Sequence, residues 1–304
     1  MRLTVAVRTS LKAALALAVT LGLAFQESAL AQSPVTAAGA TAAGSACPPA
    51  NPDMAKGFEQ FTEAMLAPGK AMNISEMIKA MPPETLARMA AMQRADTDRK
   101  AKDWPNLCRY VSENAQIIAS GTRPRVVFIG DSITENWKLG DPTLFSATTL
   151  DRGIGGQTTP QILLRFYQDV VALHPRVAHI MAGTNDISGN TGPTSDEAIV
   201  NNISAMIDIA KANGIRVVLA SITPSKGFAM RPGFDPSARI ASVNRQLVRL
   251  AAERHVTWVD YFSPLVDGAG GFNTALANDG LHPNRDGYAI MRPLAERAFA
   301  RVVK

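Results

Sequence analysis

The chain has 304 residues, of which 46% are hydrophobic and 19% charged, with a formal net charge of +5. This composition is typical of a globular protein with a large core, and the length fits one or two domains. The small, scattered positive charge argues against a nucleic-acid partner. No stretch is apolar over the roughly 20 residues that span a bilayer, so stable membrane insertion is not expected.

The first 31 residues have the features of a cleaved secretory signal peptide. Three basic residues precede an apolar run at positions 13–25, and an Ala-Leu-Ala cleavage site ends at Ala31. A membrane anchor is the alternative, but the run is too short to span a bilayer. We therefore expect cleavage before Gln32, a mature net charge of +3, and a periplasmic or secreted location.

The two cysteines, Cys47 and Cys108, both lie in the exported part of the chain, where oxidation is permitted. We expect a disulfide between them, which closes a long loop and stabilises the fold by about 4 kcal/mol on the chain-entropy model. Neither cysteine has another Cys or a His at ligand spacing, so we expect no metal site.

The chain before the main domain changes character twice. Residues 32–46 are mostly Ala, Gly, Thr and Ser, which predicts a flexible leader. Residues 47–122 hold seven of the twelve methionines and predict a small helical segment, with one helix opening at Pro83 and continuing through Met89 and Met92. The methionine stripe favours packing against the main domain, and an adaptable surface for a protein partner is the alternative.

From residue 123 to the end, short β-branched runs alternate with helical stretches. This alternation predicts an α/β fold in which a five-stranded parallel sheet carries helices on both faces. The expected strands are residues 125–129, 149–154, 177–181, 215–220 and 256–260, and the expected helices are residues 160–173, 195–213, 236–254 and 285–303.

The loops that follow parallel strands emerge at one edge of the sheet, so polar residues far apart in sequence should meet there. A nucleophile, glycines, an amide donor and an acid-base pair are expected at this edge, which is the set that acyl transfer needs. The four loops are Asp131-Ser132, Gly155-Gly156-Gln157, Gly183-Thr184-Asn185-Asp186 and Asn278-Asp279-Gly280-Leu281-His282.

Ser132 is the candidate nucleophile and needs a base within hydrogen-bond reach. His282 is the one histidine expected at this edge, and Asp279 can accept from one ring nitrogen while the other faces the serine. The backbone N–H groups of Ser132 and Gly156 and the side-chain amide of Asn185 are the candidate oxyanion donors. Taken singly, each residue also fits an ordinary helix cap or turn.

The remaining polar residues are expected to be structural. Asp131 and Asp186 fit loop braces better than acids, and the other histidines fit structural or surface positions. No serine lies in a Gly-x-Ser-x-Gly motif, so a nucleophile-elbow hydrolase is disfavoured.

The ordered set of motifs resembles the SGNH or GDSL hydrolase family, over about residues 125–303. The resemblance implies a flavodoxin-like three-layer sandwich and esterase activity without a cofactor. It implies Ser132 as nucleophile, Gly156 and Asn185 as oxyanion donors, and Asp279 with His282 completing the triad. Gln157 stands where many members have Asp. The four motifs are Gly130-Asp131-Ser132, Gly153-Ile154-Gly155-Gly156-Gln157-Thr158, Gly183-Thr184-Asn185-Asp186 and Asp279-Gly280-Leu281-His282-Pro283.

The sequence therefore predicts a secreted serine esterase of the acetylhydrolase type, which removes short acyl groups from a small ester or an acetylated carbohydrate through an acyl-enzyme on Ser132. One alternative is a lysophospholipase or thioesterase that accepts longer acyl chains. Another is a non-catalytic carbohydrate-binding or scaffold protein. The presence of serine, histidine, aspartate and amide together favours an enzyme, because a binding protein needs no such set.

Overall fold

The computed structural model divides the chain into two units, residues 1–46 and residues 47–304. The expected signal peptide and leader occupy the first unit and lie outside the residues that the structure describes. Those residues all belong to the second unit and comprise residue 47 and residues 59–69, 82–228 and 231–302.

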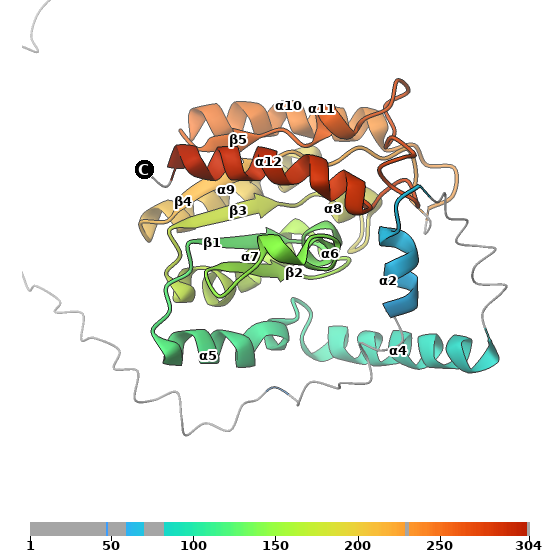
Figure 1. The fold of residues 1–304 in the computed structure, drawn as a ribbon, viewed down its shortest axis with the longest axis horizontal. Coiled ribbons are helices and arrows are strands. Elements are labelled where there is room, and N and C mark those ends of the chain that lie inside the picture. The colour runs from blue at the N-terminus through green and yellow to red at the C-terminus, as the bar shows by residue number, and fades with distance from the viewer. Residues whose placement is uncertain (1–46, 48–58, 70–81, 229–230, 303–304) are drawn as a thin grey trace, which may run out of the picture. The chain divides into compact units, whose positions relative to one another are not determined.

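A five-stranded parallel sheet lies at the centre of the second unit, with the strand order β2-β1-β3-β4-β5 (Figure 1). The register pairs Gly130 at the end of β1 with Gly153 of β2 and Met181 of β3, so the strands end at a common edge. The predicted α/β fold and its strands are confirmed. The strands are β1 (Val126–Gly130), β2 (Thr149–Gly153), β3 (Val177–Met181), β4 (Arg216–Ala220) and β5 (Thr257–Val259).

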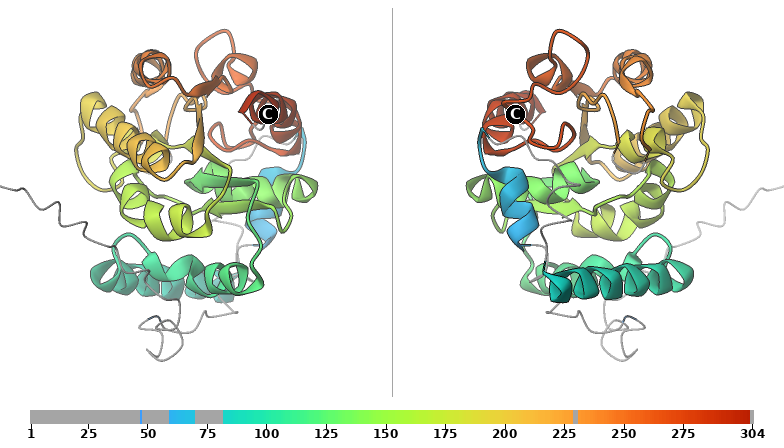
Figure 2. Two further views of the ribbon diagram at one scale, coloured as in Figure 1. Left: turned by 90° about the vertical axis from the view of Figure 1, so that its left-hand side faces the viewer. Right: turned by 90° about the vertical axis from the view of Figure 1, so that its right-hand side faces the viewer.

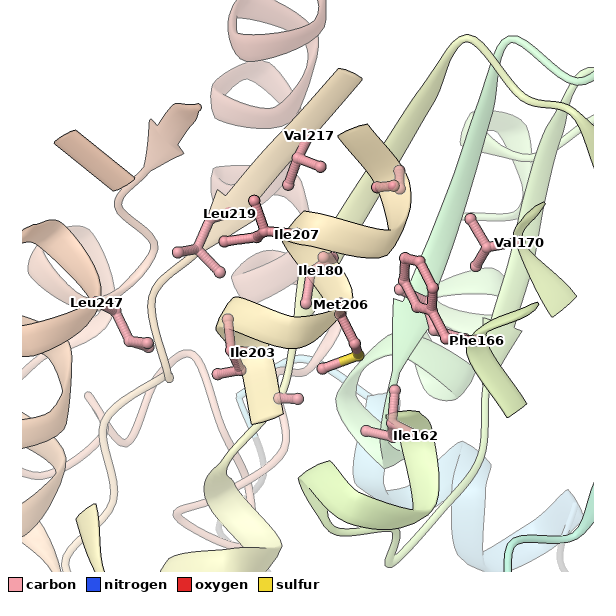
Figure 3. Packing of buried hydrophobic residues seen from close by; sticks show 14 of the residues in the cluster. Ile162, Phe166, Val170, Ile180, Ile203, Met206, Ile207, Val217, Leu219 and Leu247 are labelled. Carbon is pink, nitrogen blue, oxygen red and sulfur yellow. The ribbon is translucent and has the colours of Figure 1, made fainter. Parts of the chain in front are cut away.

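Three helices cover one face of the sheet, namely α7 (Thr159–Asp169), α9 (Asp196–Ala212) and α10 (Ser237–Glu253). Apolar residues recur along each helix at three- and four-residue spacing and form one continuous core against the strands. Figure 3 shows side chains of this core, including Ile162, Phe166, Val170, Ile180, Ile203, Met206, Ile207, Val217, Leu219 and Leu247.

Helices α6 (Ser132–Gly140) and α12 (Arg285–Val302) cover the opposite face of the sheet. The ring of Trp137 lies 5.4 Å from that of Phe128 and 5.5 Å from that of Tyr288, measured between centroids. Helices thus lie on both sides of the sheet (Figure 2), and both faces of β1 are buried, as its continuous apolar sequence predicts.

Several short helices connect these elements. Some lie in stretches that were expected to be helical, namely residues 47–122 and 160–173, and the sequence patterns did not reveal the others. One of them, α8, has only five residues. In addition, α6 begins at Ser132, which was expected to lie in a loop. The shorter and connecting helices are α2 (Glu59–Leu66), η2 (Leu107–Tyr110), α5 (Val111–Ser120), η3 (Pro142–Leu144), η4 (Val171–Leu173), α8 (Thr184–Ser188) and α11 (Phe262–Leu265). None of the helices in the described residues is long and apolar enough for a membrane span.

Helix α4 (Pro83–Lys102) begins at the predicted proline, but its expected packing into the core is wrong. None of its residues is buried, and Met89 and Met92 are only half-buried. Eight of its twenty residues are charged, so the methionine stripe is too narrow to outweigh the solvation of the charged faces.

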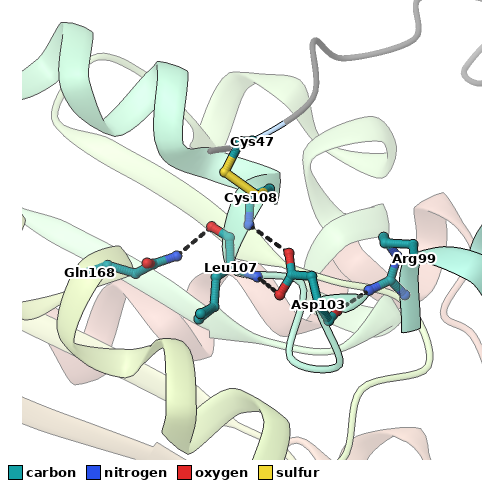
Figure 4. The surroundings of a disulfide bond; sticks show 6 residues. All are labelled: Cys47, Arg99, Asp103, Leu107, Cys108 and Gln168. Atoms are coloured by element: carbon teal, nitrogen blue, oxygen red, sulfur yellow. Dashed lines mark hydrogen bonds between the residues drawn. A yellow bond between two sulfur atoms is a disulfide. The ribbon is translucent and has the colours of Figure 1, made fainter. Parts of the chain in front are cut away.

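The chain that follows α4 is held against the main domain by glutamine side chains, and a disulfide joins this chain to Cys47. Cys47 and Cys108 are joined, with their Cα atoms 5.3 Å apart (Figure 4). Three glutamines on and before α7 donate to three backbone carbonyls of this segment. These bonds run from Gln161 to Trp104 (2.8 Å), from Gln157 to Pro105 (2.7 Å) and from Gln168 to Leu107 (2.6 Å).

Tyr110 completes the contact between this segment and the sheet. Its hydroxyl donates to the carbonyl of Gly153 at the end of β2. Its ring lies beside two guanidinium groups, with Arg109 Cζ 4.8 Å and Arg152 Cζ 4.6 Å from the ring centroid. Because Tyr110 and Arg152 are both buried, the cation–π contact between them is shielded from water and therefore strengthened, whereas Arg109 is exposed.

Removal of the disulfide should destabilise the protein without abolishing activity. The bond joins residues separated by 61 positions, so its loss should lower the free energy of unfolding by about 4 kcal/mol and the melting temperature by on the order of 10 °C. The glutamine contacts remain, so kcat at low temperature should be retained. Thermal unfolding and ester hydrolysis of the Cys47→Ser/Cys108→Ser protein test this, and identical melting curves with and without the bond would contradict it.

Candidate active site

The loop after β1 places Ser132 at the start of α6. Asp131 caps this helix, because its carboxylate accepts the backbone N–H of Ile133 over 3.0 Å. As the first residue of the helix, Ser132 has a backbone N–H without an intrahelical partner. The positive end of the helix dipole also favours negative charge near this serine.

The loop before α12 brings a histidine and an aspartate to the same serine. Ser132 Oγ lies 2.9 Å from His282 Nε2, and His282 Nδ1 lies 2.6 Å from Asp279 Oδ2. The other oxygen of Asp279 accepts the backbone N–H groups of Leu281 and His282. The carboxylate thus fixes the loop as well as the ring, and the series of bonds is the one that activates a serine hydroxyl.

The charges in this series favour an ionised aspartate and a basic histidine. Burial raises the pKa of Asp279, but hydrogen bonds from His282 and the charge of its ring outweigh burial and leave this pKa below its ordinary value. Burial likewise lowers the pKa of His282, and the hydrogen bond and charge of Asp279, with the charge of Asp131, raise it above its ordinary 6.5. Asp131 itself has a pKa raised by burial to about 6.

Asn185 and Gly156 supply further donors at this edge. Asn185 is the second residue of α8, and its Nδ2 donates to the carbonyl of Gln157 over 3.0 Å. Within the described residues, no protein atom accepts the second N–H of the Asn185 amide or the backbone N–H groups of Gly156 and Ser132. Three N–H groups are thus left to bind a ligand.

Gly153 at the end of β2 and Gly156 in the following loop occupy positions that favour glycine for different reasons. Gly156 has a φ of +75°, which favours glycine, while a Cβ there would meet nothing closer than Asn190 Nδ2 at 3.8 Å. A side chain at Gly156 would therefore strain the backbone without meeting another protein atom closely. At Gly153, in contrast, a Cβ would lie 2.2 Å from the backbone nitrogen of Glu135.

Other polar residues of the predicted loops serve as braces. Asp186 accepts the backbone N–H of Thr159 over 2.8 Å and its hydroxyl over 2.6 Å, which fixes the start of α7. Gln157 accepts from Arg165 Nε over 2.6 Å while donating to the N-terminal segment. Both side chains therefore make hydrogen bonds that hold neighbouring segments in place.

The other three histidines do not join the site. His179 is buried in the core, where its Nε2 lies 3.0 Å from the hydroxyl of Tyr261 and burial lowers its pKa to about 3. His174 and His255 have positive φ angles at the ends of a 3₁₀ helix and an α-helix.

The structure adds two site residues that the sequence did not reveal. Glu135 accepts the backbone N–H of Gly155 over 2.7 Å and so holds the glycine loop close to Ser132. Asn190 contacts Asn185 and Gly156. Glu135 follows Ser132 by three residues, which places it in the first turn of α6 once that helix is known, whereas no sequence signal identifies Asn190.

A cavity of about 300 Å³ lies beside α8, and none of the proposed catalytic residues lines it. Ile187 and Pro193 are the apolar side chains among its lining residues, which also include two arginines, Arg231 and Arg239. No group of three or more His, Cys, Asp or Glu side chains that could hold a metal ion occurs in the part of the chain that the structure describes.

Comparison with known proteins identifies the class to which this fold and site belong. The sequence model of the GDSL-like lipase/acylhydrolase family matches residues 128–290, more than half of the chain. A "putative acylhydrolase" from Bacteroides fragilis NCTC 9343 is 39% identical, with a TM-score of 0.63 over 66% of this chain and 99% of that one. The protein belongs to the GDSL-like lipase/acylhydrolase family.

One further solved structure agrees with this assignment, and one curated protein matches a shorter stretch of the chain. The structure of a GDSL-like lipase from Bacteroides thetaiotaomicron VPI-5482 is 37% identical, with a TM-score of 0.62 over 66% of this chain and 99% of that one. The uncharacterized lipoprotein YqeF of Bacillus subtilis (strain 168) is 35% identical over 78 residues, or 25% of this chain. The match covers 32% of YqeF, about a third of its length.

Proposed function

We propose that this protein is a serine esterase that hydrolyses carboxylic esters through an acyl-enzyme on Ser132. The observation that carries the proposal is the continuous series of hydrogen bonds from Ser132 through His282 to Asp279, with distances of 2.9 and 2.6 Å. Family membership supports hydrolase chemistry, and the three unpaired N–H groups beside the serine support stabilisation of an oxyanion.

In the first half-reaction, Ser132 Oγ attacks the ester carbonyl carbon as its proton passes to His282 Nε2. The carbonyl oxygen becomes an oxyanion, which the backbone N–H groups of Ser132 and Gly156 and the Asn185 amide bind. Asp279 stabilises the imidazolium. The bond to the alcohol oxygen then breaks, His282 returns its proton to that oxygen, and the acyl group remains on Ser132.

In the second half-reaction, water replaces the alcohol. His282 accepts a proton from the water, whose oxygen attacks the acyl carbon and regenerates an oxyanion in the same donor set. The bond between the acyl carbon and Ser132 Oγ breaks, and the proton on His282 returns to the serine. A carboxylic acid leaves, and the free enzyme is restored without a cofactor.

The acyl group is proposed to be short, such as an acetyl group, on a small ester or a carbohydrate. The resemblance of the motifs to the acetylhydrolase-type branch of the family supports this proposal. The cavity beside α8 does not bear on it, because none of the proposed catalytic residues lines that cavity. Lysophospholipase or thioesterase activity on longer chains remains the second candidate, since all these reactions use the same serine chemistry.

Export is also part of the proposal. A signal peptide over residues 1–31 and a leader over residues 32–46 would deliver a helical segment of residues 47–122 and a catalytic domain of residues 123–304 to the periplasm or medium. The disulfide between Cys47 and Cys108 supports an oxidising location, and the name lipoprotein given to YqeF agrees with export.

Hydrolysis of p-nitrophenyl esters of rising chain length, beside acetylated oligosaccharides, tests the proposed substrate class. We expect kcat/KM to be greatest for acetate or butyrate and to fall by roughly 10-fold or more by octanoate, because the added methylene groups of the longer acyl chains would have no apolar pocket to bind in. EDTA should leave the rate unchanged. A rate that rises steadily to the longest esters would favour the lysophospholipase or thioesterase alternative.

A further inference from the structure

A side chain just after α8 contacts two of the proposed oxyanion residues at once. Asn190 Nδ2 donates to Asn185 Oδ1 over 2.8 Å and to the backbone carbonyl of Gly156 over 3.1 Å. The backbone N–H of Asn190 also donates to the carbonyl of Asn185 over 3.0 Å. The position of Asn190 is therefore fixed at the end of the helix that carries Asn185.

These contacts decide which end of the Asn185 amide can face a ligand. A carboxamide is nearly symmetrical in shape, so it can fit its site with the nitrogen or the oxygen in either place. Here Asn185 Oδ1 faces the Asn190 donor, and Asn185 Nδ2 faces the carbonyl of Gln157. The reverse orientation would place two NH₂ groups together and two oxygens together.

We infer that Asn190 is a positioning residue for ester hydrolysis, which holds the Asn185 amide with its second N–H toward the oxyanion and steadies Gly156. This inference rests on the proposed function. An oxyanion donor acts only if it is aligned before the charge develops, since reorientation during the reaction costs free energy. One side-chain nitrogen thus orders donors on two separate loops.

Two variants of Asn190 distinguish the removal of its N–H donor from the replacement of that donor by an acceptor. Asn190→Asp keeps the shape but places carboxylate oxygens against Asn185 Oδ1 and the Gly156 carbonyl. It should lower kcat by about 10² to 10³, as should Asn185→Ala, with little change in KM. Asn190→Ala should cost only roughly 10-fold, because Asn190 is exposed and water can take its place.

Thr191→Val is the matched control. Thr191 Oγ1 donates to Thr158 Oγ1 over 3.1 Å and so connects the same two loops without touching Asn185 or Gly156. If the inference is correct, this variant should keep kcat within about 2-fold of the wild type. An equal loss in Thr191→Val and Asn190→Asp would overturn a specific role for the Asn190 amide. Melting curves identify any variant that fails to fold.

A double variant tests whether Asn190 acts through Asn185. In an Asn185→Ala background, Asn190→Asp should lower kcat by less than about 5-fold. This residual loss would come from the lost contact between residue 190 and the Gly156 carbonyl. If Asn190→Asp lowers kcat by about 10² to 10³ in that background as well, or if both single Asn190 variants have normal kcat, the positioning role of Asn190 is overturned and the proposed function still stands. Normal kcat in Asn185→Ala would overturn the proposed oxyanion role of Asn185, and the inference with it.

Discussion

Replacement of Ser132 by Ala should abolish ester hydrolysis while the protein stays folded. The hydroxyl is the proposed covalent acceptor, and its loss also leaves His282 Nε2 without its 2.9 Å partner. By the precedent of other triad serines, kcat should fall on the order of 10⁴-fold or more. Burst kinetics with p-nitrophenyl acetate and labelling by a fluorophosphonate measure the loss directly.

The fold should tolerate this change, because alanine suits the first turn of a helix and the capping bond from Ile133 to Asp131 remains. Circular dichroism and the melting temperature serve as controls. A folded Ser132→Ala protein with near-normal turnover would eliminate the acyl-enzyme mechanism. Loss of both turnover and fold would call for Ser132→Gly or Ser132→Thr before any conclusion on chemistry.

Asp279→Asn should cause the second large loss, about 10⁴-fold in kcat. The asparagine oxygen can still accept the backbone N–H groups of Leu281 and His282, so the loop should keep its shape. The NH₂ group would then face His282 Nδ1 and favour the tautomer with a proton on Nε2. That tautomer cannot accept the proton of Ser132.

The same substitution should move the pH dependence in a defined direction. In the wild type, the pKa of His282 lies above 6.5, so kcat/KM should rise with pH through that higher value as the ring loses its proton. Without Asp279 its charge and hydrogen bond disappear while burial remains, so the pKa should fall. An NMR titration of His282 in Ser132→Ala, with and without Asp279→Asn, measures this shift independently of activity; equal midpoints would show that Asp279 does not control the ring.

The central sheet could be predicted because most strands are short runs with β-branched residues between turn signals, and parallel order follows from the alternation with helices. β2 (Thr149–Gly153) is the exception, since it has one β-branched residue and carries Asp151 and Arg152. The helices that were missed are short or begin inside a motif. α8 spans Thr184–Ser188, and a five-residue helix has no stability of its own. It forms because Ile187 packs into the core and Gly183 precedes it with a φ of +123°.

Much of the candidate site could be anticipated because parallel strands bring their following loops to one edge. That rule brings Ser132 and His282 together without any knowledge of loop shape. It does not reveal which side chains align the donors. Gly189 has a φ of +80° and turns the chain so that Asn190 reaches Gly156, and such a path depends on loop packing rather than on a motif.

The glutamine contacts to Trp104, Pro105 and Leu107 make this stretch part of the packed domain, although it precedes all of the catalytic motifs. A chain cut at residue 123 would keep every motif, yet Gln157 and Gln161 would face solvent or each other with their former acceptors gone. Gly153 would also lose the hydroxyl of Tyr110. A segment that lies outside residues 128–290 thus supplies hydrogen-bond partners to the loop after β2 and to α7.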